Sequence, residues 1–295
     1  MADDFTRIRA TEYVLGRYHL TTLQEAQERL TPTQFEGLMG EIAGVQAQLT
    51  AQAQPRPALP AETGSRGIMT PFGPILPVTG LLLVVIWIVF AIENAMNGSE
   101  SESVLTLMGA TTVDMLATGQ YWRLLAACFL HIGPAHIITN SISLIVLGSL
   151  AERFYGPLRY LGIYLAAGVG GNIAVGLLQL GPGAGASGAI FGLLGAILVG
   201  AVRNRRVIGS ALQRQIVGSL GTMLVLNIGI SFLPGISAYA HFGGLAIGAA
   251  LALLIPFRSP RYPRAYAAAA NGVSVVLVVA SLALMLTWLG NHAPQ

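Results

Sequence analysis

Two long stretches without Asp, Glu, Lys or Arg constrain the fold of this chain more than any other feature. They run from Tyr160 to Val202 and from Gln215 to Phe257. Each is about twice as long as the roughly 20 apolar residues that cross a bilayer core as one helix. Each is also interrupted near its middle, at Gly181-Pro182-Gly183 and at Leu233-Pro234-Gly235. Because Pro and Gly break helices, each stretch predicts two membrane-spanning helices joined by a tight turn.

Three further apolar segments complete the expected set of spans. Residues 67 to 92 are uncharged, residues 134 to 150 begin with Pro134 after Gly133, and residues 265 to 289 form a last apolar run. Proline at the first helical position is a start signal. With 54% hydrophobic and only 10% charged residues, the composition is also that of a membrane protein. The sequence predicts an all-α polytopic membrane protein with seven spans.

The arginines indicate which ends of the spans lie inside. Loops 151–159, 203–214 and 258–264 contain nine arginines, whereas the segments on the other side contain only Arg123. Basic residues concentrate in cytoplasmic loops. We therefore expect a cytoplasmic N-terminus and an outer C-terminus. No basic face of the kind that binds nucleic acid is present, so nucleic acid is not an expected partner.

The composition divides the chain into four parts. Residues 1–54 are a polar, helical, cytosolic segment with capping-box patterns at Thr22-x-x-Glu25 and Thr33-x-x-Glu36. Residues 55–74 are a linker and membrane entry, and residues 75–257 hold the first six spans. Residues 258–295 hold a loop, the seventh transmembrane helix and a short outer tail.

A few polar residues at membrane depth are the candidates for chemistry, because placing polar groups in lipid costs free energy. They are His131, His136, Asn140, Ser187, Asn227 and His241. Ser187 opens the fourth span, and His241 lies in the first turns of the sixth. His136 and Asn140 are four residues apart and so share one face of the second span. We expect Ser187, His241, His136 and Asn140 at one depth, toward the outer side.

This set suits acyl transfer. A serine hydroxyl becomes a nucleophile when a base accepts its proton, and His241 is the only histidine after Ser187 within a span. The Ser187 N–H at a helix N-terminus, the Asn140 amide and the His136 ring are possible donors to an oxyanion. No Asp or Glu follows Glu152. A triad in the order Ser, acid, His is therefore excluded, and catalysis would use a dyad.

The small residues around these positions also have a purely structural interpretation. Gly188-x-x-x-Gly192 and Gly244-x-x-x-Gly248 are patterns that let helices pack closely. A serine in such a contact is ordinary, so Ser187 alone does not indicate catalysis.

The histidines allow two further interpretations. His136 and Asn140 could form an interhelical hydrogen-bond pair instead of an oxyanion hole. A metal site made from His131, His136 and His241 is disfavoured, because carboxylates are lacking nearby and His131 precedes the helix start. We expect no metal and no cofactor.

An ordered set of motifs resembles the rhomboid intramembrane serine proteases. The motifs are Tyr121-Trp122-Arg123, His131-x4-His136-x3-Asn140, Glu152-Arg153-x-x-Gly156, Gly185-x-Ser187-Gly188 and His241-x-x-Gly244-x-x-x-Gly248. The resemblance covers about residues 75 to 257. It implies a six-helix catalytic core with one C-terminal transmembrane helix appended, in a bacterial-type plasma membrane with the active site opening outward.

The resemblance implies roles for individual residues. Ser187 would be the nucleophile, His241 the general base and then acid, and His136 with Asn140 the side-chain part of the oxyanion hole. Gly185 and Gly188 would flank the nucleophile, and Phe191 would pack against the catalytic imidazole. Trp122 and Arg123 match a motif of the first outer loop, which Glu152 would help to hold. Gly244 and Gly248 follow the catalytic histidine in its helix.

The implied activity is cleavage of single-span membrane proteins near the outer membrane face. Such substrates carry a small residue before the scissile bond and a helix-destabilising stretch after it. Substrate proteins and membrane lipid are the expected partners, and the oligomeric state is left open. One alternative is a catalytically silent rhomboid-like protein that binds membrane proteins and passes them on. A transporter is disfavoured, because the second half lacks the charged residues of a transport path.

Overall fold

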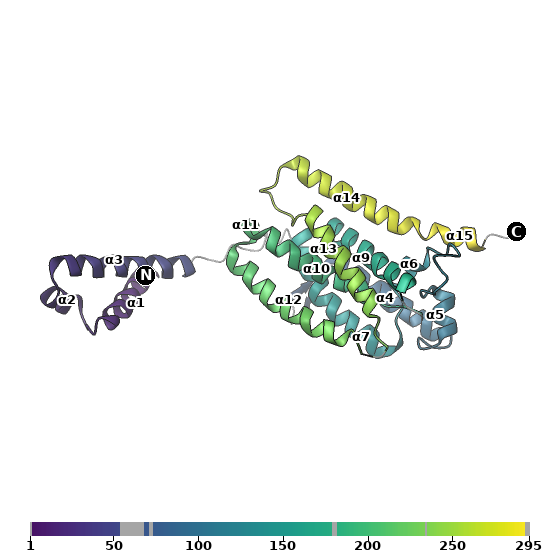
Figure 1. Cartoon of the computed structure of the whole chain (residues 1–295), viewed down its shortest axis with the longest axis horizontal. Helices are drawn as coiled ribbons and strands as arrows, with labels where there is room; N and C mark the ends of the chain where they lie inside the picture. Colours follow the sequence, from purple (N-terminus) through teal and green to yellow (C-terminus); the bar gives the residue numbers. More distant parts are fainter. Residues whose placement is uncertain (1, 54–67, 71–72, 179–181, 234, 293–295) are drawn as a thin grey trace. The chain divides into compact units, whose positions relative to one another are not determined.

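The computed structural model describes residues 2–53, 68–70, 73–178, 182–233 and 235–292. Two compact units are present, Met1–Ala58 and Leu59–Gln295, and Figure 1 shows both. Most of the expected linker, residues 55–67 and 71–72, lies outside the described residues.

The first unit consists of three helices, α1 (Ala2–Arg17), α2 (Leu23–Arg29) and α3 (Pro32–Ala53). Helices α1 and α3 pack against each other around a small apolar core that includes Val14 and Leu38. This core gives the segment a packed interior of its own, separate from that of the second unit.

The helix starts in this unit agree with one expected capping box and correct the other. Thr22 caps α2 by accepting a hydrogen bond from the Glu25 N–H at 3.1 Å, as its pattern predicts. At α3 the box is formed by Thr31 and Gln34, whose reciprocal bonds measure 3.0 and 3.4 Å, and not by Thr33 and Glu36. The reason is that Pro32 occupies the first helical position, which makes the residue before it the cap.

The second unit is built mainly from helices. Its helices are α4 (Pro77–Ala95), α5 (Glu102–Met108), α6 (Arg123–Ala126), α7 (Gly133–Ser143), α8 (Ser149–Tyr155), α9 (Pro157–Leu178), α10 (Ser187–Arg203), α11 (Arg205–Ile208), α12 (Ser210–Ile230), α13 (Ala238–Leu254), α14 (Arg264–Ala283) and α15 (Leu286–His292). A π-helical turn, η1 (Leu144–Gly148), joins α7 to α8. A helix therefore lies in each region where the sequence predicts a span, and α10 begins at Ser187 as expected.

In the part of the chain that the structure describes, four helices are long and apolar enough to cross a membrane by length and composition. They cover Pro77–Ala95, Gly133–Tyr155, Pro157–Leu178 and Arg264–Leu289. Two more apolar helices, Ser187–Arg203 and Ala238–Leu254, are shorter. The chain thus has several helices suited to a bilayer.

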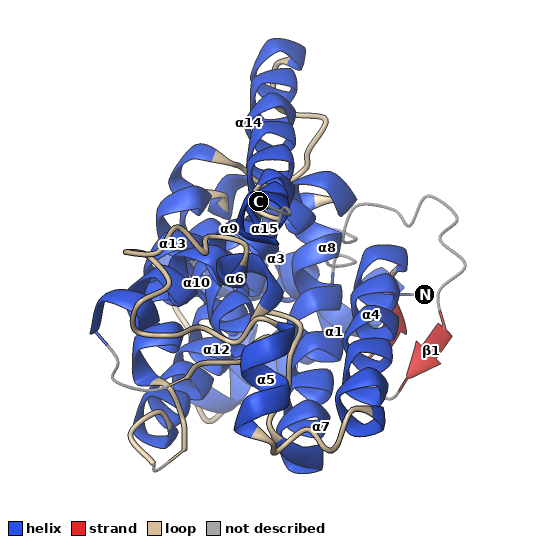
Figure 2. Ribbon diagram, turned by 90° about the vertical axis from the view of Figure 1, so that its right-hand side faces the viewer, coloured by secondary structure: helices blue, strands red, loops and turns tan. Residues whose placement is uncertain are grey.

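The first expected span begins later in the structure than the sequence predicts. Instead of a helix from residue 67, strands β1 (Ile68–Thr70) and β2 (Gly73–Ile75) pair antiparallel, and α4 begins only at Pro77. Figure 2 shows this short hairpin beside α4. Proline lacks the N–H that a helix interior needs but is accepted in the first turn, so Pro74 favours the extended strand and Pro77 the helix start.

Helix α10 packs against α9 and α13, and α14 packs on α9 (Figure 1). Where α10 crosses α13, a Cβ on Gly244 would overlap the Gly188 carbonyl oxygen, and one on Gly248 would overlap the Gly192 carbonyl oxygen. The small-residue patterns therefore do bring two helix backbones into contact. Helix α10, which begins with Ser187, is therefore held beside α13, which carries His241.

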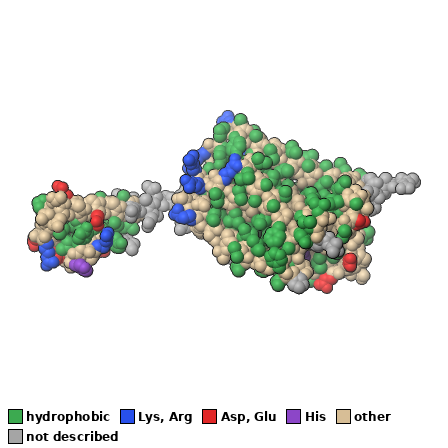
Figure 3. Space-filling view, in the orientation of Figure 1, with side chains coloured by type: hydrophobic (Ala, Val, Ile, Leu, Met, Phe, Trp, Pro, Cys, Tyr) green, Lys and Arg blue, Asp and Glu red, His purple; other side chains and the backbone are tan. Residues whose placement is uncertain are grey.

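The surface of this unit is apolar around the helices and basic at one end (Figure 3). Large apolar side chains such as Val84, Val225 and Val276 are more than half exposed on α4, α12 and α14. Arg203 ends α10, the helix that Ser187 begins. The basic end is therefore opposite to the end of α10 at which Ser187 lies.

Glu152 has a different place from the one that the resemblance implies. Its buried carboxylate accepts hydrogen bonds from the Val78 N–H at 3.0 Å, the Thr79 N–H at 2.8 Å and the Thr79 hydroxyl at 2.8 Å. These groups form the first turn of α4, whose unpaired N–H groups and positive dipole end attract a carboxylate. Glu152 therefore caps the start of α4 and does not hold the outer loop, which follows the other end of that helix.

We expect Glu152→Gln to destabilise the protein by about 1–3 kcal/mol, because the amide NH2 would face a buried N–H donor and leave it unpaired. Thermal unfolding of the purified protein measures the change. Glu102→Gln is the matched control, since Glu102 is exposed on α5. Equal unfolding midpoints for the two variants would contradict the capping role.

Candidate active site

The segment before Ser187 is fixed by the loop that follows α5. The Thr111 N–H donates to the Gly183 carbonyl at 2.9 Å, and the Gly183 N–H donates back to the Thr111 carbonyl at 3.3 Å. Two residues on, the Gly185 N–H donates to the Ala127 carbonyl at 2.8 Å. These bonds determine where α10 begins and so where the Ser187 side chain lies.

Ser187 is the first residue of α10 and is half-buried. Its own N–H is one of the first-turn donors that have no partner within the helix. The positive end of the helix dipole lies at the same place. A serine oxygen and a backbone donor are thus presented together at one edge of a cavity.

His136 lies on the other side of Gly185 from Ser187. A Cβ on Gly185, whose φ is +135°, would lie 2.8 Å from His136 Nε2 and 3.7 Å from Ser187 Oγ. Only a residue without a side chain allows this approach. The Ile132 N–H donates to His136 Nδ1 at 3.3 Å. Because Nδ1 accepts, this partner assigns the proton to Nε2, which faces Ser187 as a donor.

Asn140 lies one helix turn beyond His136 and is buried. Its Nδ2 donates to the His136 carbonyl at 3.1 Å. One of the two amide hydrogens is satisfied in this way, and the second remains for another acceptor. The pair is joined within its own helix, so this bond is not interhelical.

His241 lies in the first turn of α13 and is held on two sides. Phe191 stacks on its ring with centroids 4.0 Å apart and planes 11° from parallel. Ser231 Oγ, at the end of α12, lies 2.7 Å from His241 Nδ1. Ser231 was not among the residues that sequence reasoning selected, although it is a polar residue at the boundary of an apolar stretch.

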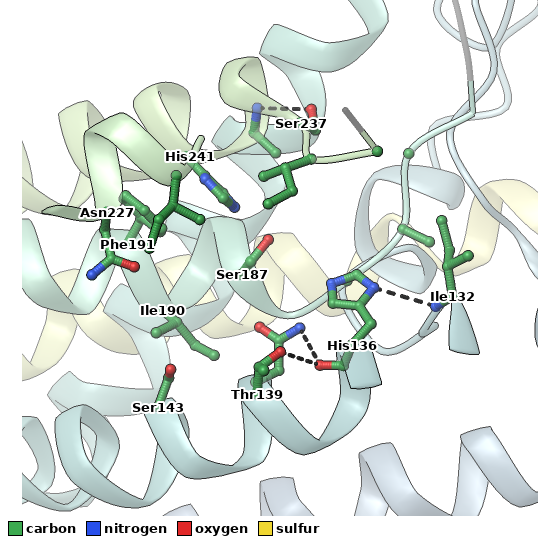
Figure 4. Close-up of a pocket in the computed structure, with 18 of the residues that line it drawn as sticks. Ile132, His136, Thr139, Ser143, Ser187, Ile190, Phe191, Asn227, Ser237 and His241 are labelled. Atoms are coloured by element: carbon green, nitrogen blue, oxygen red, sulfur yellow. Dashed lines mark hydrogen bonds between the residues drawn. The ribbon is translucent and has the colours of Figure 1, made fainter. Parts of the chain in front are cut away.

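The candidate site contains a cavity of about 790 Å³. Figure 4 shows the His241 ring directed toward Ser187, with His136 on the opposite side of the serine. Ser187, His241, His136, Asn140 and Asn227 all contribute to its wall. Among the described residues, Ser187 and His241 form no hydrogen bond with each other, as is common before substrate is bound.

Trp122 and Arg123, the motif expected in the first outer loop, lie outside the cavity and form hydrogen bonds within that loop. Arg123 donates to the Thr106 carbonyl at 2.6 Å, to the Ala110 carbonyl at 3.0 Å and to the Gln120 side chain at 2.6 Å. The Trp122 N–H donates to Thr287 Oγ1 at 2.9 Å, which ties the loop to α15. These contacts support the loop that positions Gly183 and Gly185.

Two other reactive side chains lie near this loop and are inert. Burial raises the pKa of the Cys128 thiol to about 12, so the thiol stays protonated at neutral pH. Burial and the nearby His136 lower the pKa of His131 to about 3, which keeps His131 neutral. Over the described ranges, no three His, Cys, Asp or Glu side chains gather in a way that could hold a metal ion.

This chain is similar to known proteins that have rhomboid names. The Rhomboid domain matches residues 118–257. Rhomboid protease GluP of Bacillus subtilis (strain 168) is 37% identical over 220 residues, which are 74% of this chain and 41% of GluP. YdcA of the same organism is also named as a rhomboid protease. It is 34% identical over 144 residues, which are 47% of this chain and 69% of YdcA.

A relative with a different name also matches. Inactive RHOMBOID-like protein 8 of Arabidopsis thaliana is 31% identical over 153 residues, 52% of this chain and 43% of that protein. The chain spans less than half the length of GluP and of this relative.

Proposed function

Because the chain belongs to the rhomboid family and is an integral membrane protein, we propose that it is an intramembrane serine endopeptidase. One observation supports this above all. Ser187 lies in one cavity between two histidines, His136 on one side and His241 on the other (Figure 4). His136 presents a donor there, because its Nδ1 accepts from the Ile132 N–H, and the His241 ring is directed toward Ser187 as the candidate base. A hydroxyl between a base and an oxyanion donor is equipped for acyl transfer.

Acylation begins when Ser187 Oγ attacks the carbonyl carbon of the scissile peptide bond. Its proton passes to His241 Nε2 as the C–O bond forms. The carbonyl oxygen becomes an oxyanion and accepts hydrogen bonds from the Ser187 N–H, His136 Nε2–H and the Asn140 amide. The imidazolium then gives its proton to the departing nitrogen, the C–N bond breaks, and the amine product leaves an acyl-enzyme.

Deacylation repeats these steps with water as the nucleophile. His241 accepts a proton from a water molecule while the water oxygen attacks the ester carbon. The second oxyanion accepts hydrogen bonds from the same three donors as the first. The proton returns to Ser187 Oγ as the ester bond breaks. The carboxylic acid product leaves and gives its proton to water, and the enzyme returns to its starting state.

The substrate class follows from the chemistry of the bilayer. A helical peptide bond in lipid is already hydrogen-bonded and surrounded by side chains, so it must unwind before Ser187 can reach its carbonyl. Gly or Pro near the cleavage site lowers that cost. We therefore assign single-span membrane proteins as substrates, cut near the outer membrane face.

The same proposal includes the orientation and the division of the chain. Residues 75–257 form the six-helix catalytic core, and α14 adds a seventh span. The arginine-rich end faces the cytoplasm with the segment 1–54, and the cavity opens outward from the plasma membrane. The arginine distribution supports this orientation.

A fluorophosphonate probe tests the proposed activity on the wild-type protein. The probe should label purified protein in detergent, and mass spectrometry should locate the adduct on Ser187. The same protein in liposomes should cleave a single-span reporter with Gly and Pro in its helix. Folded protein that neither reacts nor cleaves would overturn the proposal and favour the catalytically silent, membrane-protein-binding alternative.

The oxyanion donors give a separate prediction. We expect His136→Ala and Asn140→Ala each to lower kcat on the order of 10²–10³-fold, because each removes one donor to the oxyanion. KM should change little, since the oxyanion forms only in the transition state. Reporter cleavage over a range of substrate concentrations separates the two constants. A raised KM at unchanged kcat would contradict the assigned role.

A further inference from the structure

The His241 ring has two nitrogens, and among the described residues Nδ1 is the one with a hydrogen-bonding partner. Nδ1 lies 2.7 Å from Ser231 Oγ, while the ring points toward Ser187 (Figure 4). Ser231 is 1% exposed and forms the C-cap of α12, so its hydroxyl lies in a fixed and dry place. Water therefore does not compete for Nδ1.

The Ser231 hydroxyl also has a backbone carbonyl oxygen within hydrogen-bonding distance. Ser231 Oγ lies 2.7 Å from the Asn227 carbonyl oxygen, one helix turn earlier. A carbonyl oxygen only accepts, so the single hydroxyl proton goes to it. A lone pair of Ser231 Oγ then faces His241 Nδ1. The 2.7 Å contact is a hydrogen bond only if Nδ1 carries a proton and donates it.

We infer that Ser231 is a positioning residue that fixes the tautomer of His241. With the proton on Nδ1, the neutral ring keeps its lone pair on Nε2, the atom that must accept the Ser187 proton. The opposite tautomer would present Nε2–H to Ser187 and could not act as a base. This inference rests on the proposed function for its catalytic meaning but not for the tautomer itself.

Ser231 thus takes the structural place of the acid in a serine protease triad. There a carboxylate accepts the Nδ1–H, orients the ring and stabilises the imidazolium. Here no Asp or Glu follows Glu152 in the sequence. Phe191 restrains the ring plane by stacking, but a stacked ring does not distinguish the two nitrogens. The Ser231 hydroxyl does, because it contacts Nδ1 alone.

The size of the effect follows from what the hydroxyl does in the transition state. As His241 becomes an imidazolium, the Nδ1–H bond to Ser231 becomes a hydrogen bond from a charged donor, which is worth more than a neutral one. Loss of that bond predicts a fall in kcat of about 10- to 100-fold. KM should stay within about twofold, because Ser231 is buried behind the ring.

Three variants separate this role from a structural one. Ser231→Ala removes the acceptor, and Ser231→Thr keeps a hydroxyl that can donate to the carbonyl one turn earlier. Ser274→Ala is the matched control. Ser274 is 0% exposed and donates to the Ala270 carbonyl at 2.8 Å, but it lies on α14 away from the cavity.

The first readout is the protonation of His241 by ¹⁵N NMR of histidine-labelled protein at a pH where the ring is neutral, with the signal assigned by its absence from His241→Ala. We expect a proton on Nδ1 in the wild type, Ser231→Thr and Ser274→Ala, and a shift toward Nε2–H in Ser231→Ala. This readout needs no activity, so it stays valid if the proposed protease function fails. Wild-type protein with the proton on Nε2, or Ser231→Ala with an unchanged signal, would overturn the inference.

The second readout is kinetic. Ser231→Ala should show the loss of kcat while its unfolding midpoint stays close to that of Ser274→Ala, and Ser231→Thr should recover most of the loss. If the threonine variant does not fold, the alanine variant and the NMR signal decide. Wild-type kcat in folded Ser231→Ala would remove the catalytic role, whereas inert wild-type protein would instead refute the proposed function.

Discussion

Ser187→Ala is expected to lower the rate of reporter cleavage by about 10⁴-fold or more and to abolish labelling by a fluorophosphonate. Removing the oxygen nucleophile eliminates the acyl-enzyme, so only the much slower direct attack of water on the peptide bond remains. The binding cavity remains, so the variant should still bind substrate. Cleavage in liposomes and gel-based probe labelling measure the two effects.

Ser219→Ala is the control for this experiment. Ser219 is exposed on α12, and its hydroxyl donates to the Gln215 carbonyl at 2.6 Å within its own helix. This variant should react with the probe and cleave the reporter like wild type. Cleavage that persists in Ser187→Ala would show that another group attacks the peptide bond and would refute the assigned nucleophile.

Local helical periodicity was enough to predict part of the candidate site. His136 and Asn140 share a face because they are four residues apart, and α10 begins at Ser187 because a Pro-Gly interruption precedes it. Such relations depend only on neighbours in the sequence. A few polar residues in apolar segments therefore point to the cavity that the structure contains.

Hydrogen bonds between residues on different helices could not be predicted by the same reasoning. Glu152 caps Val78 and Thr79, more than 70 positions earlier, because α8 packs beside the start of α4. The contact of Ser231 with His241 depends on how the chain turns between α12 and α13. Spacing alone does not determine either geometry, since each follows from how whole helices pack.

The second large effect is expected from Gly248, where α13 meets α10. A Cβ at this position would overlap the Gly192 carbonyl oxygen and lie 2.5 Å from its carbon. The obstacle is backbone, which cannot rotate away as a flexible side chain can. Relief requires the two helices to separate. Overpacking that moves backbone costs more than the usual 1–3 kcal/mol, so we expect Gly248→Val to destabilise the protein by more than about 3 kcal/mol.

Activity should fall with stability, because the same two helices hold the proposed nucleophile and base. A displacement of about 1 Å between reacting groups can cost on the order of 10²-fold in rate. Gly248→Ala should be nearly as damaging as Gly248→Val, since the clash is with Cβ itself and the extra methyl groups add little. Thermal unfolding in detergent and the rate of probe labelling measure the two consequences.

Gly272→Val is the control for the valine substitution. Gly272 lies on α14, is exposed, and an added Cβ there meets nothing within 4 Å. It shares with Gly248 the change in helix propensity from glycine to a β-branched residue, so the difference between the two variants isolates the contact of α13 with α10. Wild-type stability and labelling in Gly248→Ala would mean that the two helices can move apart without cost, and that the close packing does not maintain the geometry of the site.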